Sequence, residues 1–471
     1  MGVFARRVRD ARRREIGCLE QFLHGSRLRK RGLARAAPAV GRFADASKKR
    51  GAHAGASMDA RAARCRDAIA RRDGRALASC VDAGASTTRD EDEDDATWTR
   101  ACGSDCDRAA TLMRERGVRA PWDDAMGAFA CARTLAGSGR DEDAVRAYEA
   151  HARGVKDFVK AYRADEDSAW TSEAWYVAVD DARALAQRAD EALKRGGEKP
   201  SKLADAGSTL MLVYRAVSQT STAEKKAPQL HVVNNLFKVY FKLNALHLCK
   251  NLINAVNLPT FLPFDSFPKS EKVTYNFYVG RLAVFEDAYE RAAEHLEYAF
   301  AHCHAQSARN VRLILQYLIP VKLILGTLPS RKLLEKYELR EFVDVVEAMR
   351  RGDARTLDAA LSDGESTFIK QGTYLILEKL RMSVYRTLFK KVHAIHGETA
   401  DAAKANQVSL AKFQTALAWC GADDVDLDEV ECIVANLIFR KFIKGYISHK
   451  NRVLVLSKAD PFPSLQTVFA D

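Results

Sequence analysis

The chain has 471 residues, of which 47% are hydrophobic and 29% charged, so it is long enough to build two or three domains around a large core. Its net charge of +12 is concentrated at one end: residues 1–57 hold 15 Lys and Arg against four acids, a net of +11, which leaves +1 for residues 58–471. A body this close to neutral excludes the inference, from net charge alone, that the whole chain is a basic nucleic-acid binder.

Residues 1–57 are rich in Arg, poor in acids and weakly periodic, so we expect a disordered basic extension there. Three interpretations stay open. The segment is an organelle transit peptide, a nuclear-localisation or RNA-contacting tail built on the basic runs 27–31 and 48–50, or sequence translated from a start upstream of the native one. The last is supported by Met58, which opens a helical pattern.

The alanine-rich segment 58–228 is predicted to form N-terminal helical repeats. Gly and Pro residues between its apolar-periodic stretches mark the helix ends. The expected helices span 59–82, 95–117, 121–137, 141–164, 168–195 and 201–220. The acidic run 90–95 repels itself in any fold, so we expect a solvated loop there, with an acidic docking motif as the alternative.

Residues 229–395 continue the helical pattern with more aromatic sequence. One long amphipathic helix is expected over 229–256, followed by a loop over 258–268 that packs on its own aromatic rings. Further helices are expected over 270–285, 287–304, 307–325, 330–337, 341–351, 353–362 and 371–395, with Asp353 and Ser366 at N-caps. Gly280 at the crossing of one hairpin resembles a tetratricopeptide-like repeat, and such hairpins stack into a right-handed solenoid.

A short polar linker, 396–408, leads to residues 409–458, which carry the pattern of a winged helix. A first helix begins at Leu410 and stops at Gly421, and a second begins at Asp426 and is expected to end at Gly445. The expected buried positions are Leu410, Phe413, Leu417 and Trp419 in the first helix and Leu427, Val430, Val434, Leu437 and Ile438 in the second. Strands are expected over 446–449 and 453–456, and residues 459–471 form a C-terminal tail.

Charge is divided sharply within this module. Residues 421–432 contain six acids and no base, and residues 440–458 contain six Lys and Arg and no acid. In a helix-turn-helix reader the start of the second helix enters the major groove, where these carboxylates would be repelled by phosphate. The wing is therefore predicted to bind a nucleic-acid backbone or to dock a protein, with a merely solvated basic face as the alternative.

No catalytic, cofactor or metal site assembles from the sequence, which lacks a phosphate loop, G-x-S-x-G, H-E-x-x-H and paired CxxC motifs. Of the ten cysteines only Cys102 and Cys106 are closely spaced, and adjacent side chains in His302-Cys303-His304 point in different directions on a helix. This pattern of scattered thiols suits a reducing compartment. The longest apolar run, 313–325, is too short and too polar to cross a membrane.

Four stretches carry a family resemblance: HVVNNLFKVYFKLNALHLCKNLINAV, FPKSEKVTYNFYVGR, QYLIPVKLILG and DEVECIVANLIFRKFIKGYISHKN. Together with a solenoid that ends in a winged helix, they resemble the PCI domain of proteasome-lid, signalosome and translation-initiation subunits. More narrowly they resemble the PCI subunit of the nuclear transcription-coupled (TREX-two type) mRNA-export complex, over about 229–465. The chain is mainly α by this resemblance: a helical-hairpin solenoid, 229–395 being the helical part of the PCI domain, capped by a winged helix.

The resemblance implies a non-enzymatic nuclear scaffold that binds a large export protein of the germinal-centre-associated nuclear protein type. It also implies a small acidic disordered partner shared with the proteasome lid, and RNA or DNA on a shared winged-helix platform. The residues expected to contact nucleic acid are Lys444, His449, Lys450, Asn451 and Arg452, with Arg440, Lys441 and Lys458 nearby and Arg381, Arg386, Lys390 and Lys391 on the preceding helix. The alternatives are a structural PCI subunit of a signalosome- or lid-like assembly and a sequence-specific regulator, the latter disfavoured by the acids at the start of the second helix.

Overall fold

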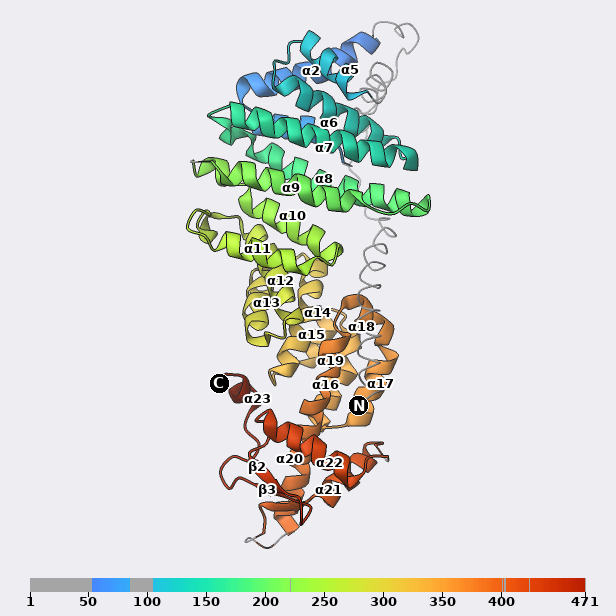
Figure 1. Ribbon diagram of the computed structural model, residues 1–471, viewed down its shortest axis with the longest axis vertical. Helices are drawn as coiled ribbons and strands as arrows, with labels where there is room; N and C mark the ends of the chain where they lie inside the picture. The colour runs from blue at the N-terminus through green and yellow to red at the C-terminus, as the bar shows by residue number, and fades with distance from the viewer. Residues whose placement is uncertain are drawn as a thin grey trace, which may run out of the picture. The chain divides into compact units, whose positions relative to one another are not determined.

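The computed structural model describes residues 53–84, 105–220, 222–399, 401, 404–422 and 424–470 (Figure 1). These residues form two compact units, 53–275 and 276–470, and the division falls within helix α12 (Lys269–Phe285). The predicted fold class is confirmed: both units are built of successive helices, and the second ends in a winged helix. No helix among the described residues is long and apolar enough to span a membrane. The predicted loop at 90–95 and the basic runs at 27–31 and 48–50 lie outside the described residues.

The first unit is a stack of antiparallel helical hairpins (Figure 1). Its core is aromatic, with the Trp175 ring stacked on Phe158 at 4.1 Å between ring centroids and Tyr162 meeting Trp175 edge-on. Burying these rings holds neighbouring hairpins together, because no single hairpin can cover its own apolar face. The helices of this unit are α2 (His53–Arg71), α3 (Gly74–Val81), α5 (Cys106–Glu115), α6 (Trp122–Gly137), α7 (Asp141–Ala164), α8 (Ser172–Arg195), α9 (Lys202–Ser218), α10 (Gln229–Lys242) and α11 (Leu246–Val256).

Three boundaries in this unit differ from the sequence-based expectation. Helix α2 begins at His53, inside the segment that we did not expect to fold. The single helix expected over 59–82 is two helices, because Arg72 adopts a left-handed backbone (φ 52°) and Asp73 caps α3. The single helix expected over 229–256 is broken in the same way at Asn244 (φ 55°). The loop over 258–268 packs on its own aromatic rings, as predicted: the ring centroids of Phe261 and Phe267 are 5.4 Å apart.

The helical part of the second unit leads into the winged helix. Asp353 caps α17 by accepting the Thr356 N–H, as predicted, whereas Ser366 lies inside a helix whose N-cap is Gly364. The helix expected over 371–395 is two helices, α19 and α20, and it is preceded by α18, which ends at a left-handed Gly372. The helices are α13 (Tyr289–His302), α14 (Ala308–Ile324), α15 (Arg331–Lys336), α16 (Val343–Arg351), α17 (Ala354–Asp363), α18 (Glu365–Gln371), α19 (Tyr374–Glu378) and α20 (Arg381–Thr399).

The winged helix contains three strands, one more than predicted. Its elements are β1 (Gln407–Ser409), α21 (Leu410–Trp419), α22 (Leu427–Phe439), β2 (Gly445–Ser448) and β3 (Val453–Leu456). The sheet is antiparallel in the order β1-β3-β2, with Val408, Leu454 and Ile447 in register on its inner side. Helix α22 ends at Phe439 rather than at Gly445, because Lys441 takes the left-handed conformation (φ 61°) that terminates it.

Residues 459–470, here called the C-terminal strap, fold back on the second unit and include α23 (Leu465–Ala470). The Arg386 guanidinium on α20 donates to the carbonyls of Phe462 and Pro463, and Gln466 donates to Thr327 at 3.1 Å. Leu465 packs against Gly326, where an added Cβ would lie 2.6 Å from the Leu465 Cβ. The strap therefore ties the winged helix to the α14–α15 connection of the same unit.

Candidate nucleic-acid interface

The hairpin tip, residues 449–452, joins β2 to β3 and folds onto the start of α22. The Arg452 Nη1 lies 2.6 Å from the Asp428 Oδ1 and 2.6 Å from the Glu431 Oε2, and the His449 Nδ1 lies 2.8 Å from the Glu431 Oε1. Arg452 has a left-handed backbone (φ 52°) and donates its N–H to the His449 carbonyl, which aims both side chains at α22. Asp428 and Glu431 on the helix and Arg452 on the wing, separate in sequence, therefore form ion pairs in the fold.

These pairs change what the tip can do. The hydrogen bond that Arg452 donates to the Asp428 carboxylate, with Glu431 beside it, raises the pKa of Arg452 and keeps its charge directed toward α22. An incoming phosphate would have to compete with two carboxylates for that guanidinium. Lys450 and Asn451 at the tip are exposed, and neither is bound to these carboxylates.

The hairpin base, defined as Arg440, Lys441, Lys444 and Lys458, lies at the opposite end of the same two strands. Lys444 is placed there by two backbone hydrogen bonds: its carbonyl accepts from Ser457 at 2.8 Å and its N–H donates to Pro461 at 2.9 Å. With four-residue strands, at ~3.3 Å per residue, base and tip are about 13 Å apart. Of the acids in the described residues, only Asp460 forms an ion pair with the base, 3.9 Å from the Lys444 Nζ. The six wing cations are thus two groups and not one surface.

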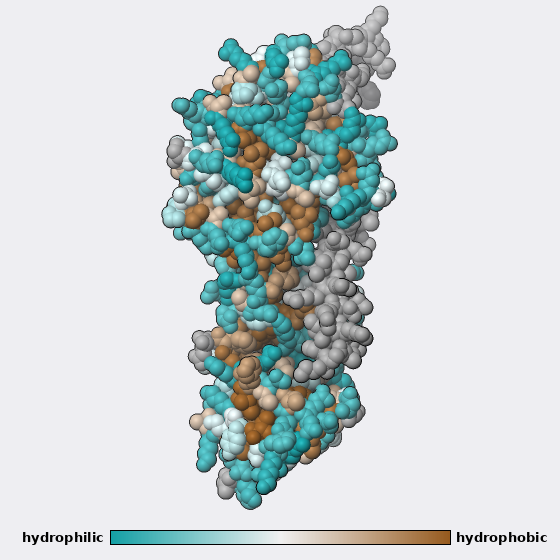
Figure 2. Space-filling view, in the orientation of Figure 1, coloured by the Kyte–Doolittle hydropathy of each residue, from teal (hydrophilic) through white to brown (hydrophobic). Residues whose placement is uncertain are grey.

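Two exposed aromatic side chains adjoin the hairpin base. Phe439, the last residue of α22, is 87% exposed, and Tyr446 on the edge strand β2 is 64% exposed. Tyr446 pairs with Val455 and so lies on the outer face of the sheet, opposite the face that carries Ile447 and the buried Leu454. Figure 2 shows hydrophobic and hydrophilic surface side by side over the winged-helix end of the second unit. Cations beside exposed rings are the combination that binds single-stranded nucleic acid by backbone contact and base stacking.

The predicted basic face of α20 does not exist as one surface. Arg386 is 8% exposed and is committed to the strap carbonyls, so its prediction as a nucleic-acid contact is wrong. Arg381 lies 2.6 Å from Asp358, and Lys391 donates to the Arg351 carbonyl at 2.8 Å, so both face α16 and α17. Lys390 is exposed, one helical turn beyond Arg386. Arg386 and Lys390 are four residues apart and lie on neighbouring parts of one helix face, so the strap that covers Arg386, and not the helical period, separates them.

A further exposed ring was predicted to be buried. Trp419 is 85% exposed, whereas Leu410, Phe413 and Leu417 of the same helix are buried as expected. The spacing of 410, 413 and 417 continues at 420 or 421, so the helical period itself places position 419 off the buried stripe. Trp419 borders a hollow of about 550 Å³ between α17 and α21, which is lined by Arg355, Gln414, Thr415, Ala418, Trp419 and Val425.

Nothing among the described residues supports bound metal or acid–base catalysis at this surface. No group of three or more His, Cys, Asp or Glu side chains among them is arranged to hold a metal ion. The His302 Nδ1 donates to the Tyr298 carbonyl of its own helix, 2.9 Å away, and the imidazole stacks on the Tyr298 ring. The surface is suited to binding.

Comparison with known proteins gives two profile matches and a set of full-length relatives. A PCI-domain profile matches residues 359–458, and a profile described as PSMD3-like, N-terminal TPR repeats, matches residues 199–344. The chain is 43% identical over 321 residues to Enhanced ethylene response protein 5 of Arabidopsis thaliana, covering 68% of this chain and 76% of that protein. It is 41% identical over 334 residues to PCI domain-containing protein 2 of Xenopus laevis, covering 70% and 82%. It is 31% identical over 353 residues to the CSN12 homolog of Neurospora crassa, covering 68% and 77%.

Proposed function

Since the chain belongs to the PCI domain-containing protein 2 family, whose members are scaffold subunits, we propose that it is a subunit of a nuclear mRNA-export complex that presents a winged-helix surface to RNA. The proposed partners are a large export scaffold of the germinal-centre-associated nuclear protein type and a small acidic disordered protein. Catalysis is no part of this role.

The observation that carries the proposal is the hairpin base. Lys441 and Lys458 are exposed and form no ion pair with any residue that the structure describes, and the exposed Phe439 and Tyr446 lie within two residues of Arg440 and Lys444 along the chain. Contacts of this kind neutralise phosphates and stack on bases without reading base edges. We therefore propose single-stranded RNA as the favoured ligand, bound with high salt sensitivity and little sequence preference.

The near-neutral body of the chain sets the conditions of binding. Residues 58–471 carry a net charge of +1, so long-range attraction to a polyanion is weak and a few local cations supply it. Useful affinity therefore depends on a second basic surface, contributed by the export scaffold or by residues 1–57. Lys450 and Asn451 extend the path toward the hairpin tip.

The test compares two single substitutions with the same change of charge, made in the assembled complex. Lys441→Glu at the base and Lys450→Glu at the tip each replace an exposed cation by an anion on the same hairpin. We expect Lys441→Glu to weaken binding to a single-stranded RNA several-fold and to lower the slope of log K against log salt by about 0.7, and Lys450→Glu to do less. Equal binding by wild type and Lys441→Glu across a salt titration would reject the hairpin base as the RNA surface.

A second function is favoured by one observation on the tip. Ion pairs close it against α22, and β2 is an edge strand of the sheet, as would suit a wing that docks another protein. The alternative is thus a structural PCI subunit of a signalosome- or proteasome-lid-like assembly. Affinity purification of the full chain from its own cells distinguishes the two: a large export scaffold with a small acidic protein supports export, and recovery of signalosome or lid subunits supports the alternative.

A further inference from the structure

The α5–α6 hairpin of the first unit brings two cysteines into contact, far along the chain from the winged helix. The Arg114 Nε lies 2.6 Å from the Asp123 Oδ2, and one turn further on α6 packs on α5 so closely that a Cβ at Gly127 would lie 2.5 Å from the Ala110 nitrogen. From the first contact to the second, the residue number decreases on α5 and increases on α6, so the two helices are antiparallel. One more turn along each helix reaches Cys106 and Cys131.

The thiols meet at that level. Cys106 and Cys131 are hydrogen-bonded to each other, and both are free thiols. The small residues Gly127, Ala109 and Ala110 bring the two backbones together, which is the condition for two cysteines to reach bonding distance without movement of either helix. Cys131 is 3% exposed, and Cys106 is partly exposed to solvent.

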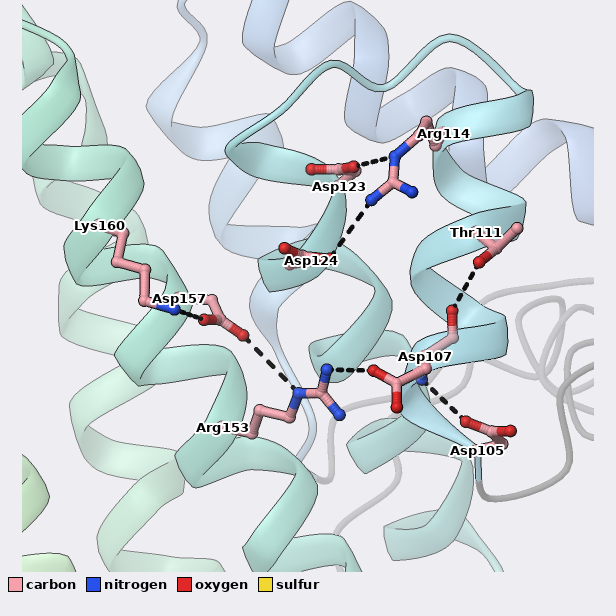
Figure 3. A network of polar contacts seen from close by, with 9 residues as sticks. All are labelled: Asp105, Asp107, Thr111, Arg114, Asp123, Asp124, Arg153, Asp157 and Lys160. Atoms are coloured by element: carbon pink, nitrogen blue, oxygen red, sulfur yellow. Dashed lines mark hydrogen bonds and ion pairs between the residues drawn. The ribbon is translucent and has the colours of Figure 1, made fainter.

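The surroundings of Cys106 favour its thiolate. It is the first residue of α5, where the positive end of the helix dipole favours a negative charge, and the Asp105 carboxylate caps the Asp107 and Arg108 N–H groups at the same end. The hydrogen bond from Cys131 lowers the pKa of Cys106 to about 7, and the nearby Arg153 guanidinium acts in the same direction, against burial and the carboxylates of Asp107 and Asp105. Figure 3 shows Arg153 held in place between Asp107 and Asp157, on α5 and α7.

We propose that Cys106 and Cys131 form a peroxide-reactive dithiol that closes to a disulfide between α5 and α6. The Cys106 thiolate attacks one oxygen of hydrogen peroxide, the O–O bond breaks, and hydroxide leaves, so Cys106 becomes a sulfenic acid. The Cys131 thiol then attacks the Cys106 sulfur; an S–S bond forms, the S–O bond breaks, and water leaves with the thiol proton. Two electrons pass from the pair to one peroxide, and a small-molecule thiol reverses the reaction by exchange.

The chain contains a second contacting pair for comparison. Cys65 and Cys80 are hydrogen-bonded between α2 and α3, and Arg61 and Arg64 favour a thiolate there. Cys65, however, is 2% exposed in the body of α2, and Cys80 lies in the last turn of α3, where the carbonyl end of the helix opposes a thiolate. The Cys106–Cys131 pair is therefore expected to oxidise first.

The experiment treats the reduced full chain with hydrogen peroxide at neutral pH, blocks the remaining thiols and maps disulfides by mass spectrometry without reduction. Cys102 shares the tryptic peptide 101–108 with Cys106, so the reference protein carries Cys102→Ser. We expect a link between peptides 101–108 and 120–133 that dithiothreitol removes, that forms before any Cys65–Cys80 link, and that Cys106→Ser abolishes.

Two variants complete the test. Cys131→Ser should leave Cys106 as a sulfenic acid that dimedone traps, and Cys432→Ser, which changes an exposed thiol on α22, should leave the link intact. The proposal is overturned if the reference protein accumulates sulfinic acid at Cys106 without the link, if the Cys65–Cys80 link forms first, or if neither thiol reacts. A far-UV melting curve for each variant establishes that the hairpin is folded in the comparison.

Discussion

The tip and the base of the β2–β3 hairpin are both basic in sequence, yet the fold gives them different charges. At the tip, the Arg452 guanidinium is paired with the carboxylates of Asp428 and Glu431, and Lys450 forms no ion pair with a residue that the structure describes. At the base, Lys444 alone of the four Lys and Arg meets a carboxylate among the described residues, that of Asp460. The two groups lie about 13 Å apart on the same pair of strands.

The difference teaches that a run of like charges on a chain does not define a surface. A basic residue that has no acid in its own segment can still pair with an acid on the neighbouring element, because a hairpin that packs on a helix brings the two segments together. Exposed pairs of this kind contribute little stability, about 0 to 1 kcal/mol, but they remove a cation from the set available to a ligand. Four predictions test this difference between tip and base.

The largest effect is expected from Leu437→Asp, which should unfold the winged helix and so disrupt the hairpin tip and the hairpin base together. Leu437 is fully buried in α22, and an unpaired carboxylate there should cost the winged helix about 4 kcal/mol or more. Thermal unfolding followed by circular dichroism measures the loss. The matched control is Phe439→Asp, on the same helix but 87% exposed, which should melt like the wild type. Similar melting of both variants would contradict the register of α22.

The next effect separates the base from the tip through the strap. Arg386→Ala removes the guanidinium that binds the Phe462 and Pro463 carbonyls, and hydrogen bonds from a charged donor contribute about 2 kcal/mol. Because Pro461 also accepts the Lys444 N–H, the base should loosen while the tip pairs persist. Hydrogen exchange should rise at Lys444 and Ser457 and not at Arg452, and Lys390→Ala, exposed on the same helix, is the control. Unchanged exchange at Lys444 would show that the strap does not support the base.

A third prediction concerns the exposed rings. Phe439→Ala should weaken binding of single-stranded RNA to the assembled complex by about 1 kcal/mol, because a stacked base loses its platform. Trp419→Ala is the control, since Trp419 is equally exposed but borders the separate hollow between α17 and α21. The same RNA in duplex form should bind both variants alike, because its bases are already stacked. A loss confined to Trp419→Ala would move the RNA path to that hollow.

Periodicity and turn chemistry predicted most of the fold, and three of the missed helix ends share one cause. Three helix ends that the sequence did not reveal occur where Arg72, Asn244 and Lys441 adopt a left-handed backbone. At each of these positions, the N–H of the next residue donates to the carbonyl of the residue five positions before it. This hydrogen bond usually accompanies a Gly at the left-handed position. Arg72 and Lys441 carry no local signal for the stop, and Asn244 carries only the weaker one that Asn gives in place of Gly.

The candidate site was predictable in composition but not in arrangement. The basic residues of the wing were identified, and so were the acids at the start of α22, but their pairing depends on how the hairpin packs against the helix. Arg386 was assigned to an exposed face because its partners, the strap carbonyls, lie 76 and 77 residues away in sequence. Contacts of that range follow from tertiary packing, which a helical stripe does not encode.

The smallest effect is expected from Glu431→Gln, which should make the tip resemble the base. The substitution keeps the size of the side chain and removes the charge that holds Arg452 and His449, at a cost in stability of about 0.5 kcal/mol because the pairs are partly exposed. Arg452 would still meet Asp428, so Asp428→Asn is added in the same chain to release it. The double variant should bind RNA more tightly than the wild type, and its slope of log K against log salt should steepen by about 0.7.

The control for a change of charge alone is Glu429→Gln. Glu429 follows Asp428 on α22 and has no wing partner among the described residues, so its substitution changes the net charge without freeing a cation. If Glu429→Gln with Asp424→Asn steepens the slope as much, overall charge and not the release of Arg452 governs the tip.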